Sequence, residues 1–183
     1  EKYPNEIKFD SSLINIVSFD IEVDIADGYP DVNTADKAIT SIAYKSSKSS
    51  DYHLLGLKDY DKNKTLLDLH PDNIHFMKFD SEEALLKRFK ELWVNRYPDI
   101  ITGWNVEYFD VQYIITRMKH LFGEEWVKDL SPWRNVRHKE REMFGKMPGT
   151  YQIGGMTVVD YMDAFKKFGY KYGTQESYKL DHI

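Results

Sequence analysis

Two carboxylates, Asp20 and Glu22, stand two positions apart in residues 13–23, the most hydrophobic and β-branched stretch of the chain. Side chains alternate between the two faces of a strand, so both carboxylates lie on one face, roughly 7 Å apart. Two such charges on an apolar strand are costly unless a cation lies between them, and Mg²⁺ and Mn²⁺ prefer oxygen ligands. The Asp-x-Glu spacing alone is weak evidence for a metal site. The chain repeats it at Asp80 and Glu82, where the start of a helix explains it.

A third carboxylate, Asp110, follows an apolar segment (99–104) and lies in the first turn of a helix expected over residues 108–122. The helix dipole favours an ionised acid at this position and keeps it near the strand end. Alone, this is an ordinary helix N-terminus, so Asp110 becomes a candidate metal ligand only beside the first pair. Asn105, on the preceding turn, could cap the helix or bind substrate.

Other site chemistries find little support in the chain. It has no cysteine, which excludes disulfides, cysteine zinc sites and thiol nucleophiles. The six histidines form no metal-ligand spacing, and no Gly-rich phosphate loop or Ser-His-Asp arrangement is found. His75 and Asp80 have the spacing of a histidine-containing nuclease motif but precede Asp110, so their order is wrong.

Composition indicates one folded domain: 183 residues with 42% hydrophobic and 15% aromatic side chains. No apolar run is long enough to cross a membrane, and no signal peptide is recognisable. The net charge of −5 argues by itself against nucleic-acid binding. The basic stretch 134–139 is usually just a solvated face, but it could contact phosphates.

The periodicity of the chain predicts an α/β fold with a mixed sheet. Helices are expected from a capping-box-like start at Asp80 and Glu83 up to Pro98, and over 108–122 and 161–168. An exposed β-hairpin is expected within 133–153. Strands are expected at 13–23, 38–44, 51–57, 74–79, 99–104 and 156–160.

The chain resembles a known family at two motifs. Residues 19–22 (FDIE) are similar to the first exonuclease motif of family B DNA polymerases, and residues 102–110 (TGWNVEYFD) to the second. Further stretches resemble the replicative polymerases of T-even-like tailed bacteriophages. They are residues 27–30, 130–134, 159–168 and 177–183.

This resemblance implies a ribonuclease-H-like mixed sheet flanked by helices, with an inserted hairpin at 134–152. It implies a proofreading 3′→5′ exonuclease that uses two Mg²⁺ or Mn²⁺ ions. Asp20 and Glu22 would ligate the catalytic ion, with Asp20 bridging to a second ion held by Asp110.

The resemblance also implies substrate contacts. Asn105 and Phe109 would line the groove for the primer end, and Tyr29 would pack on frayed bases. The implied partners are the single-stranded primer 3′ end, primer–template DNA and the remaining polymerase domains, with no membrane. The implied location is the cytoplasm, that of the host if the protein is phage-encoded.

The family's third motif, Tyr-x3-Asp, is not found in the sequence; the nearest match places Glu176 four residues after Tyr172. We therefore expect residues 1–12 to be a leading segment from a preceding polymerase region and 13–183 to be an exonuclease domain truncated before its third motif. Such a chain would have weak or no activity.

Two alternatives remain at this point. One is a non-catalytic ribonuclease-H-like module that binds nucleic acid. The other is a stand-alone nuclease completed by Glu176.

Overall fold

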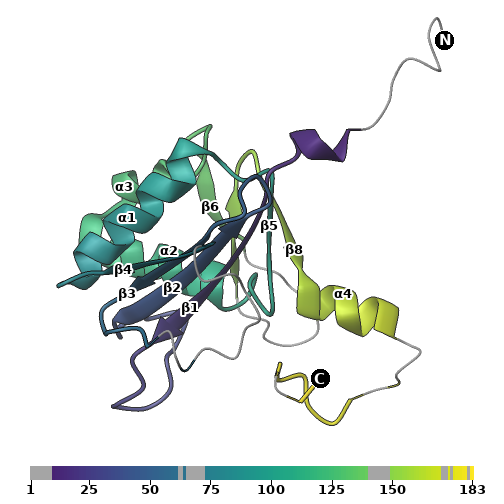
Figure 1. Ribbon diagram of the computed structural model, residues 1–183, viewed down its shortest axis with the longest axis horizontal. Helices are drawn as coiled ribbons and strands as arrows, with labels where there is room; N and C mark the ends of the chain where they lie inside the picture. Colours follow the sequence, from purple (N-terminus) through teal and green to yellow (C-terminus); the bar gives the residue numbers. More distant parts are fainter. Residues whose placement is uncertain are drawn as a thin grey trace, which may run out of the picture.

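The computed structural model describes residues 10–61, 64, 73–139, 149–169, 173, 175–180, 182 and 183. A six-stranded mixed sheet with the order β4-β3-β2-β1-β5-β8 forms its centre (Figure 1). The strands are β1 (Ile16–Val23), β2 (Ile39–Ser46), β3 (Tyr52–Gly56), β4 (Ile74–Lys78), β5 (Ile100–Gly103) and β8 (Thr157–Asp160). The helices are α1 (Glu82–Asn95), α2 (Asp110–Phe122), α3 (Glu124–Lys128) and α4 (Tyr161–Phe168), after a 3-10 turn, η1 (Ser11–Leu13).

The sheet mixes both pairing directions, as the sequence predicts. β1, β2 and β3 pair antiparallel in sequence order, connected by the loop 24–38 and the shorter loop 47–51. β5 pairs parallel to β1, β8 parallel to β5, and β4 parallel to β3. α1 lies on the connection from β1 to β5 and α2 on the connection from β5 to β8, and α4 leaves the sheet beyond the β8 edge (Figure 1). This arrangement is consistent with a ribonuclease-H-like α/β fold, and it places the ends of β1, β5 and β8 side by side.

β1 has one buried and one outward face, because its residue types alternate. Val17, Phe19 and Ile21 are almost completely buried, while Asp20 and Glu22 point outward. The split into faces expected from the sequence is therefore confirmed.

Helix α1 closes the core over the buried face of β1. Its Phe89 and Trp93 rings lie 5.6 and 5.8 Å from the ring of Phe19, and the indole N–H of Trp93 donates to the carbonyl of Leu130 at 2.8 Å. The helix begins one residue later than the predicted capping box. Ser81 is the N-cap and accepts from the amide of Ala84, because its short hydroxyl reaches that amide directly.

Helix α2 is buried on most sides and begins at Asp110 rather than near residue 108. Its N-cap is Phe109, which makes no side-chain cap hydrogen bond, so the suggestion that Asn105 caps the helix is wrong. Gly123, with φ of +87°, ends the helix in a conformation that favours glycine.

A separate pair of strands, β6 (Val136–Lys139) and β7 (Thr150–Ile153), forms an antiparallel ladder. The pairing confirms the expected hairpin strands, and the turn between them lies outside the described residues. The expectation of an exposed hairpin is wrong in part. Val136, Tyr151 and Ile153 are buried, because β7 packs against α2.

No helix in the described part of the chain is long and apolar enough to cross a membrane.

Candidate active site

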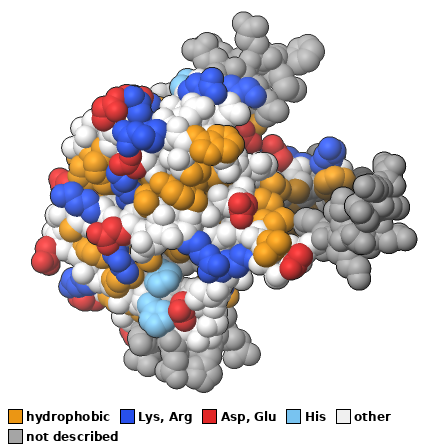
Figure 2. All heavy atoms as spheres, turned by 90° about the horizontal axis from the view of Figure 1, so that it is seen from above, with side chains coloured by type: hydrophobic (Ala, Val, Ile, Leu, Met, Phe, Trp, Pro, Cys, Tyr) orange, Lys and Arg blue, Asp and Glu red, His pale blue; other side chains and the backbone are white. Residues whose placement is uncertain are grey.

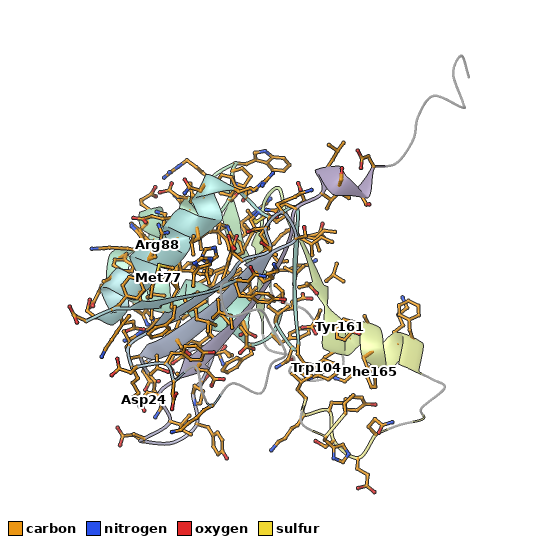
Figure 3. All side chains as sticks on the ribbon, viewed as in Figure 1. Asp24, Met77, Arg88, Trp104, Tyr161 and Phe165 are labelled. Atoms are coloured by element: carbon orange, nitrogen blue, oxygen red, sulfur yellow. The ribbon has the colours of Figure 1, made fainter. Side chains whose placement is uncertain are left out.

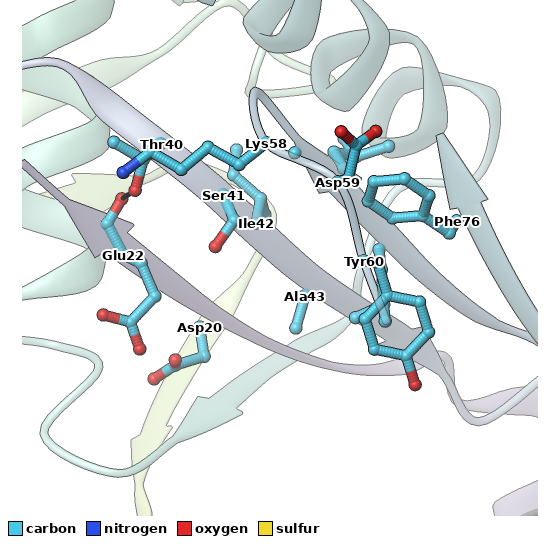
Figure 4. Close-up of a pocket in the computed structure, with 13 residues that line it drawn as sticks. Asp20, Glu22, Thr40, Ser41, Ile42, Ala43, Lys58, Asp59, Tyr60 and Phe76 are labelled. Carbon is cyan, nitrogen blue, oxygen red and sulfur yellow. Dashed lines mark hydrogen bonds between the residues drawn. The ribbon is translucent and has the colours of Figure 1, made fainter. Parts of the chain in front are cut away.

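Asp20 and Glu22 line a cavity of about 340 Å³ on the outward face of the sheet (Figure 4). In the β1–β2 register, Asp20 lies opposite Ala43 and Glu22 opposite Ser41, so the cavity floor is formed by neighbouring strands. The opposite wall is aromatic and is formed by Tyr60 and Phe76, whose ring centroids lie 5.6 Å apart. The cavity thus combines two carboxylates with an apolar wall.

Asp110 lies directly behind this pair. Its side chain is 2% exposed, and its Oδ1 accepts from the backbone amide of Ile21 at 2.9 Å. Ile21 stands between Asp20 and Glu22, so this bond connects the first turn of α2 to the middle of the carboxylate pair. The structure therefore brings together three carboxylates from two elements that lie about ninety residues apart in sequence.

The electrostatics of the three carboxylates indicate crowding of negative charge. Burial, followed by repulsion from Asp20, raises the pKa of Asp110 to about 8, although the Ile21 amide acts in the opposite direction. Asp20 reaches solvent at its edge, but partial loss of hydration raises its pKa as well, and the neighbouring Glu22 charge adds to this effect. A bound cation would relieve both costs.

The donor set fits a hard divalent cation, because it consists of carboxylate oxygens under mutual repulsion. Within the described ranges, however, no three acidic or histidine side chains converge closely enough to form a metal centre. The residues are therefore grouped but are not arranged as a completed ligand shell.

The second predicted pair, Asn105 and Phe109, lies on the loop from β5 to α2. Asn105 has a φ of +58°, a left-handed conformation that is unusual for a non-glycine residue. The ring of Phe109 is only partly exposed and stacks on Tyr113 at 5.8 Å. The loop thus leads directly to Asp110, with Phe109 anchored against α2.

Tyr29 projects from the loop between β1 and β2 and is 95% exposed. An aromatic ring this exposed contributes little to the core.

One buried carboxylate was not among the predicted site residues. Asp160, at the end of β8, is 5% exposed and accepts hydrogen bonds from the loop that carries Asn105. Its position immediately before a helix was the available sequence signal, but that signal predicts a helix cap rather than a contact with another loop.

Two positions that resemble parts of a site, Glu82 and His75, make structural contacts instead. Glu82, from the second Asp-x-Glu, is buried and pairs with Arg117 at 2.7 Å. His75 lies at the β4 edge and pairs with Asp51 at 3.2 Å. Neither contributes to the cavity beside Asp20.

The chain is similar to known proteins over most of its length. The family model described as DNA polymerase family B, exonuclease domain, matches residues 2–183. A DNA-directed DNA polymerase of Escherichia phage RB69 is 34% identical over 202 residues, covering 100% of this chain and 22% of the phage protein. A DNA-directed DNA polymerase of Enterobacteria phage T4 is 32% identical over 189 residues, covering 93% of this chain and 21% of that protein.

A more distant relative is a DNA polymerase of guinea pig cytomegalovirus, 29% identical over 57% of this chain and 10% of the viral protein. The chain spans about a fifth of the length of the two phage relatives. Because the family model covers nearly all of the sequence, the chain belongs to the exonuclease domain family of family B DNA polymerases.

Proposed function

We propose that the chain is the proofreading 3′→5′ exonuclease part of a replicative DNA polymerase, and that Asp20, Glu22 and Asp110 perform the hydrolysis. The observation that carries this proposal is the hydrogen bond from the Ile21 amide to Asp110 at 2.9 Å, which brings the third carboxylate to the Asp20–Glu22 pair. The substrate is the single-stranded 3′ end of a primer, and the reaction breaks its terminal phosphodiester bond.

Each carboxylate has a distinct role in this proposal. Asp20 and Glu22, on the solvent face of β1, would hold a divalent cation at the cavity, and Asp110, when ionised, would hold a second one behind them. When bound, the cations supply Lewis acidity, which activates water and stabilises charge on the phosphate. The site needs no thiol or histidine, which agrees with a chain that has no cysteine.

Three further residues, Tyr29, Asn105 and Phe109, position the DNA strand. Tyr29 stacks on an unpaired base, a contact worth about 1–3 kcal/mol per base. Asn105 and Phe109 line the groove for the primer end. The remaining polymerase domains and primer–template DNA are the proposed partners, and the two phage relatives support the host cytoplasm as the place of action.

The test is Mn²⁺-dependent release of the 3′ nucleotide from a labelled single-stranded oligonucleotide, measured together with Mn²⁺ binding. The Asp20→Asn variant should reduce hydrolysis by roughly 10²–10³-fold, in the range seen when one electrostatic group of an active site is removed. The matched control is Glu91→Gln, because Glu91 is exposed on α1, which covers the other face of the sheet. Equal rates in the two variants would contradict the proposal.

The activity of the 183-residue chain should be lower than that of a domain with a Tyr-x3-Asp motif, because this sequence contains none. Rates equal to those of such a domain would show that the three carboxylates suffice.

A second candidate, a nucleic-acid-binding module without catalysis, is favoured by the lack of a converged three-ligand centre in the described residues. It predicts that Asp20→Asn leaves oligonucleotide affinity unchanged and that Mn²⁺ titration detects no site. Hydrolysis and Mn²⁺ binding, measured as above, therefore separate the two functions.

A further inference from the structure

The carboxylate of Asp160 connects two segments that are far apart in the sequence. It stands at the end of β8, where it pairs with Gly103 at the end of β5. Its Oδ1 accepts from the amides of Asn105 at 3.1 Å and Met162 at 2.9 Å, and its Oδ2 accepts from the amide of Glu107 at 3.0 Å. One of these bonds caps α4, and the other two hold the β5–α2 loop.

The loop turns at a left-handed residue and is held by hydrogen bonds inside and outside it. Asn105 adopts a φ of +58°, which asparagine tolerates better than most residues but which still has a free-energy cost that the surroundings offset. Within the loop, the amide of Phe109 donates to the carbonyl of Asn105 at 3.0 Å, and that of Val111 to Val106 at 2.9 Å. These bonds connect Asn105 and its neighbour to the first turn of α2, which carries Asp110. The position of Asn105 therefore affects the position of Asp110.

Aromatic packing fixes the same junction from the other side. The ring of Trp104 lies 6.0 Å from that of Tyr161 and 5.8 Å from that of Phe165 (Figure 3). Thr102 also donates its hydroxyl to the carbonyl of Val159 at 2.8 Å. Contacts before and after Asp160 in the chain thus join the ends of β5 and β8. They fix the position of the Asp160 carboxylate relative to the loop.

From this geometry we propose that Asp160 is a positioning residue of the exonuclease site. It clamps the amides of Asn105 and Glu107, and so sets where Asn105 lies and where α2 presents Asp110 to the Asp20–Glu22 pair. The inference rests on the proposed exonuclease function. A role limited to capping α4 would need only the bond from the Met162 amide.

The Asp160→Ser variant separates the two roles. Serine is a good N-cap and can still accept from the Met162 amide, but its single oxygen is too close to the backbone to hold the loop amides as well. Asp160→Asn keeps one acceptor oxygen and should be intermediate. Asp163→Asn is the matched control, because Asp163 is exposed in the first turn of the same helix.

Two measurements on the 183-residue chain test the proposal. Asp160→Ser should lower kcat for the single-stranded oligonucleotide by about 10–100-fold with a smaller change in KM, since misplacement by about 1 Å costs on this order. Amide hydrogen exchange at Asn105 and Glu107 should become at least about tenfold faster, while Met162 stays protected. The control should match the wild type in both.

The positioning role is overturned if Asp160→Ser keeps the wild-type kcat and the wild-type exchange rates at Asn105 and Glu107. Asp160 would then only cap α4. If the wild-type chain shows no hydrolysis, exchange alone decides the clamp, since it needs no catalysis. The proposed function fails if Mn²⁺ binding is absent as well. If the Asp160→Ser variant does not fold, the Asp160→Asn variant is tested by the same criteria, with hydrogen exchange measured at the Glu107 amide.

Discussion

Asp110 is a buried carboxyl group whose ionisation the fold disfavours. It is buried, accepts the Ile21 amide and faces the charge of Asp20, so its pKa rises to about 8. The neutral acid is therefore the favoured form without metal near neutral pH, whereas a metal ligand must be ionised. Cation binding and Asp110 deprotonation are consequently coupled.

The raised pKa gives stability a definite pH dependence. Because the folded state binds the Asp110 proton more tightly than the unfolded state, its stabilising effect is complete below about pH 4 and is lost as pH rises to about 8. In chelator, the free energy of unfolding should therefore fall over this window, with an upper bound of about 6 kcal/mol.

The matched variant is Asp110→Asn, which keeps an oxygen for the Ile21 amide but does not ionise. Urea unfolding should show it close to wild type at pH 5 and more stable than wild type at pH 8. If the difference in free energy of unfolding between the two proteins does not change with pH, Asp110 is not the cause of the pH dependence.

At the scale of elements, one buried ion pair joins α1, α2 and β2. Arg117 on α2 donates to both oxygens of Glu82 on α1, at 2.9 and 2.7 Å, and Glu82 Oε1 also accepts from the amide of Ile39 on β2 at 2.7 Å. Arg117 also donates to the carbonyl of Ala35 at 3.2 Å. This network fixes α2 against the sheet and hence the direction from which Asp110 enters the site.

Breaking this pair on one side should be strongly destabilising, because the other charge remains buried. Glu82→Gln should lower the free energy of unfolding by roughly 3 kcal/mol, measured by urea denaturation. Glu91→Gln on the same helix is the control. It breaks the exposed Arg88–Glu91 pair and should cost less than about 1 kcal/mol. Similar losses in the two variants would show that the buried network does not hold α2.

Periodicity predicted well which segments are helices and which are strands. It predicted the ends of these elements and the burial of their residues less well. The alternation in β1 and the repeat of Leu85, Phe89 and Trp93 on α1 are local patterns, so the sequence predicted both. The burial of Tyr151 in the hairpin was missed, because it depends on α2, about thirty residues earlier in the chain. Local composition holds no information about that neighbour.

At the scale of the molecule, the chain has a net charge of −5, but the face shown in Figure 2 carries side chains of both signs. Acidic and basic side chains are interspersed there, so the field on this face does not by itself favour a polyanion. Cations held by the site carboxylates would supply local positive charge for a phosphate. DNA binding by the chain is therefore expected to depend on divalent metal.

Metal binding should also be visible as stability of the whole domain. At a Mn²⁺ concentration about 100 times Kd, linkage adds about 2.7 kcal/mol, which corresponds to about 5–10 °C in Tm for a chain of this size. A thermal melt should show this shift, EDTA should reverse it, and Glu22→Gln should reduce it. An equal shift in Glu22→Gln would mean that Mn²⁺ binds elsewhere.

The sequence by itself determined the α/β class, the face of β1 that carries Asp20 and Glu22, and the family, because alternation and motif spacing are local properties of the chain. The tertiary structure alone decided that the Ile21 amide binds Asp110, 89 residues away, and that Asp160 holds the loop of Asn105, 55 residues away. Such bonds form only when distant strand ends meet at one edge of the sheet. The positions of those ends depend on helix packing and strand register across the whole domain rather than on any single segment.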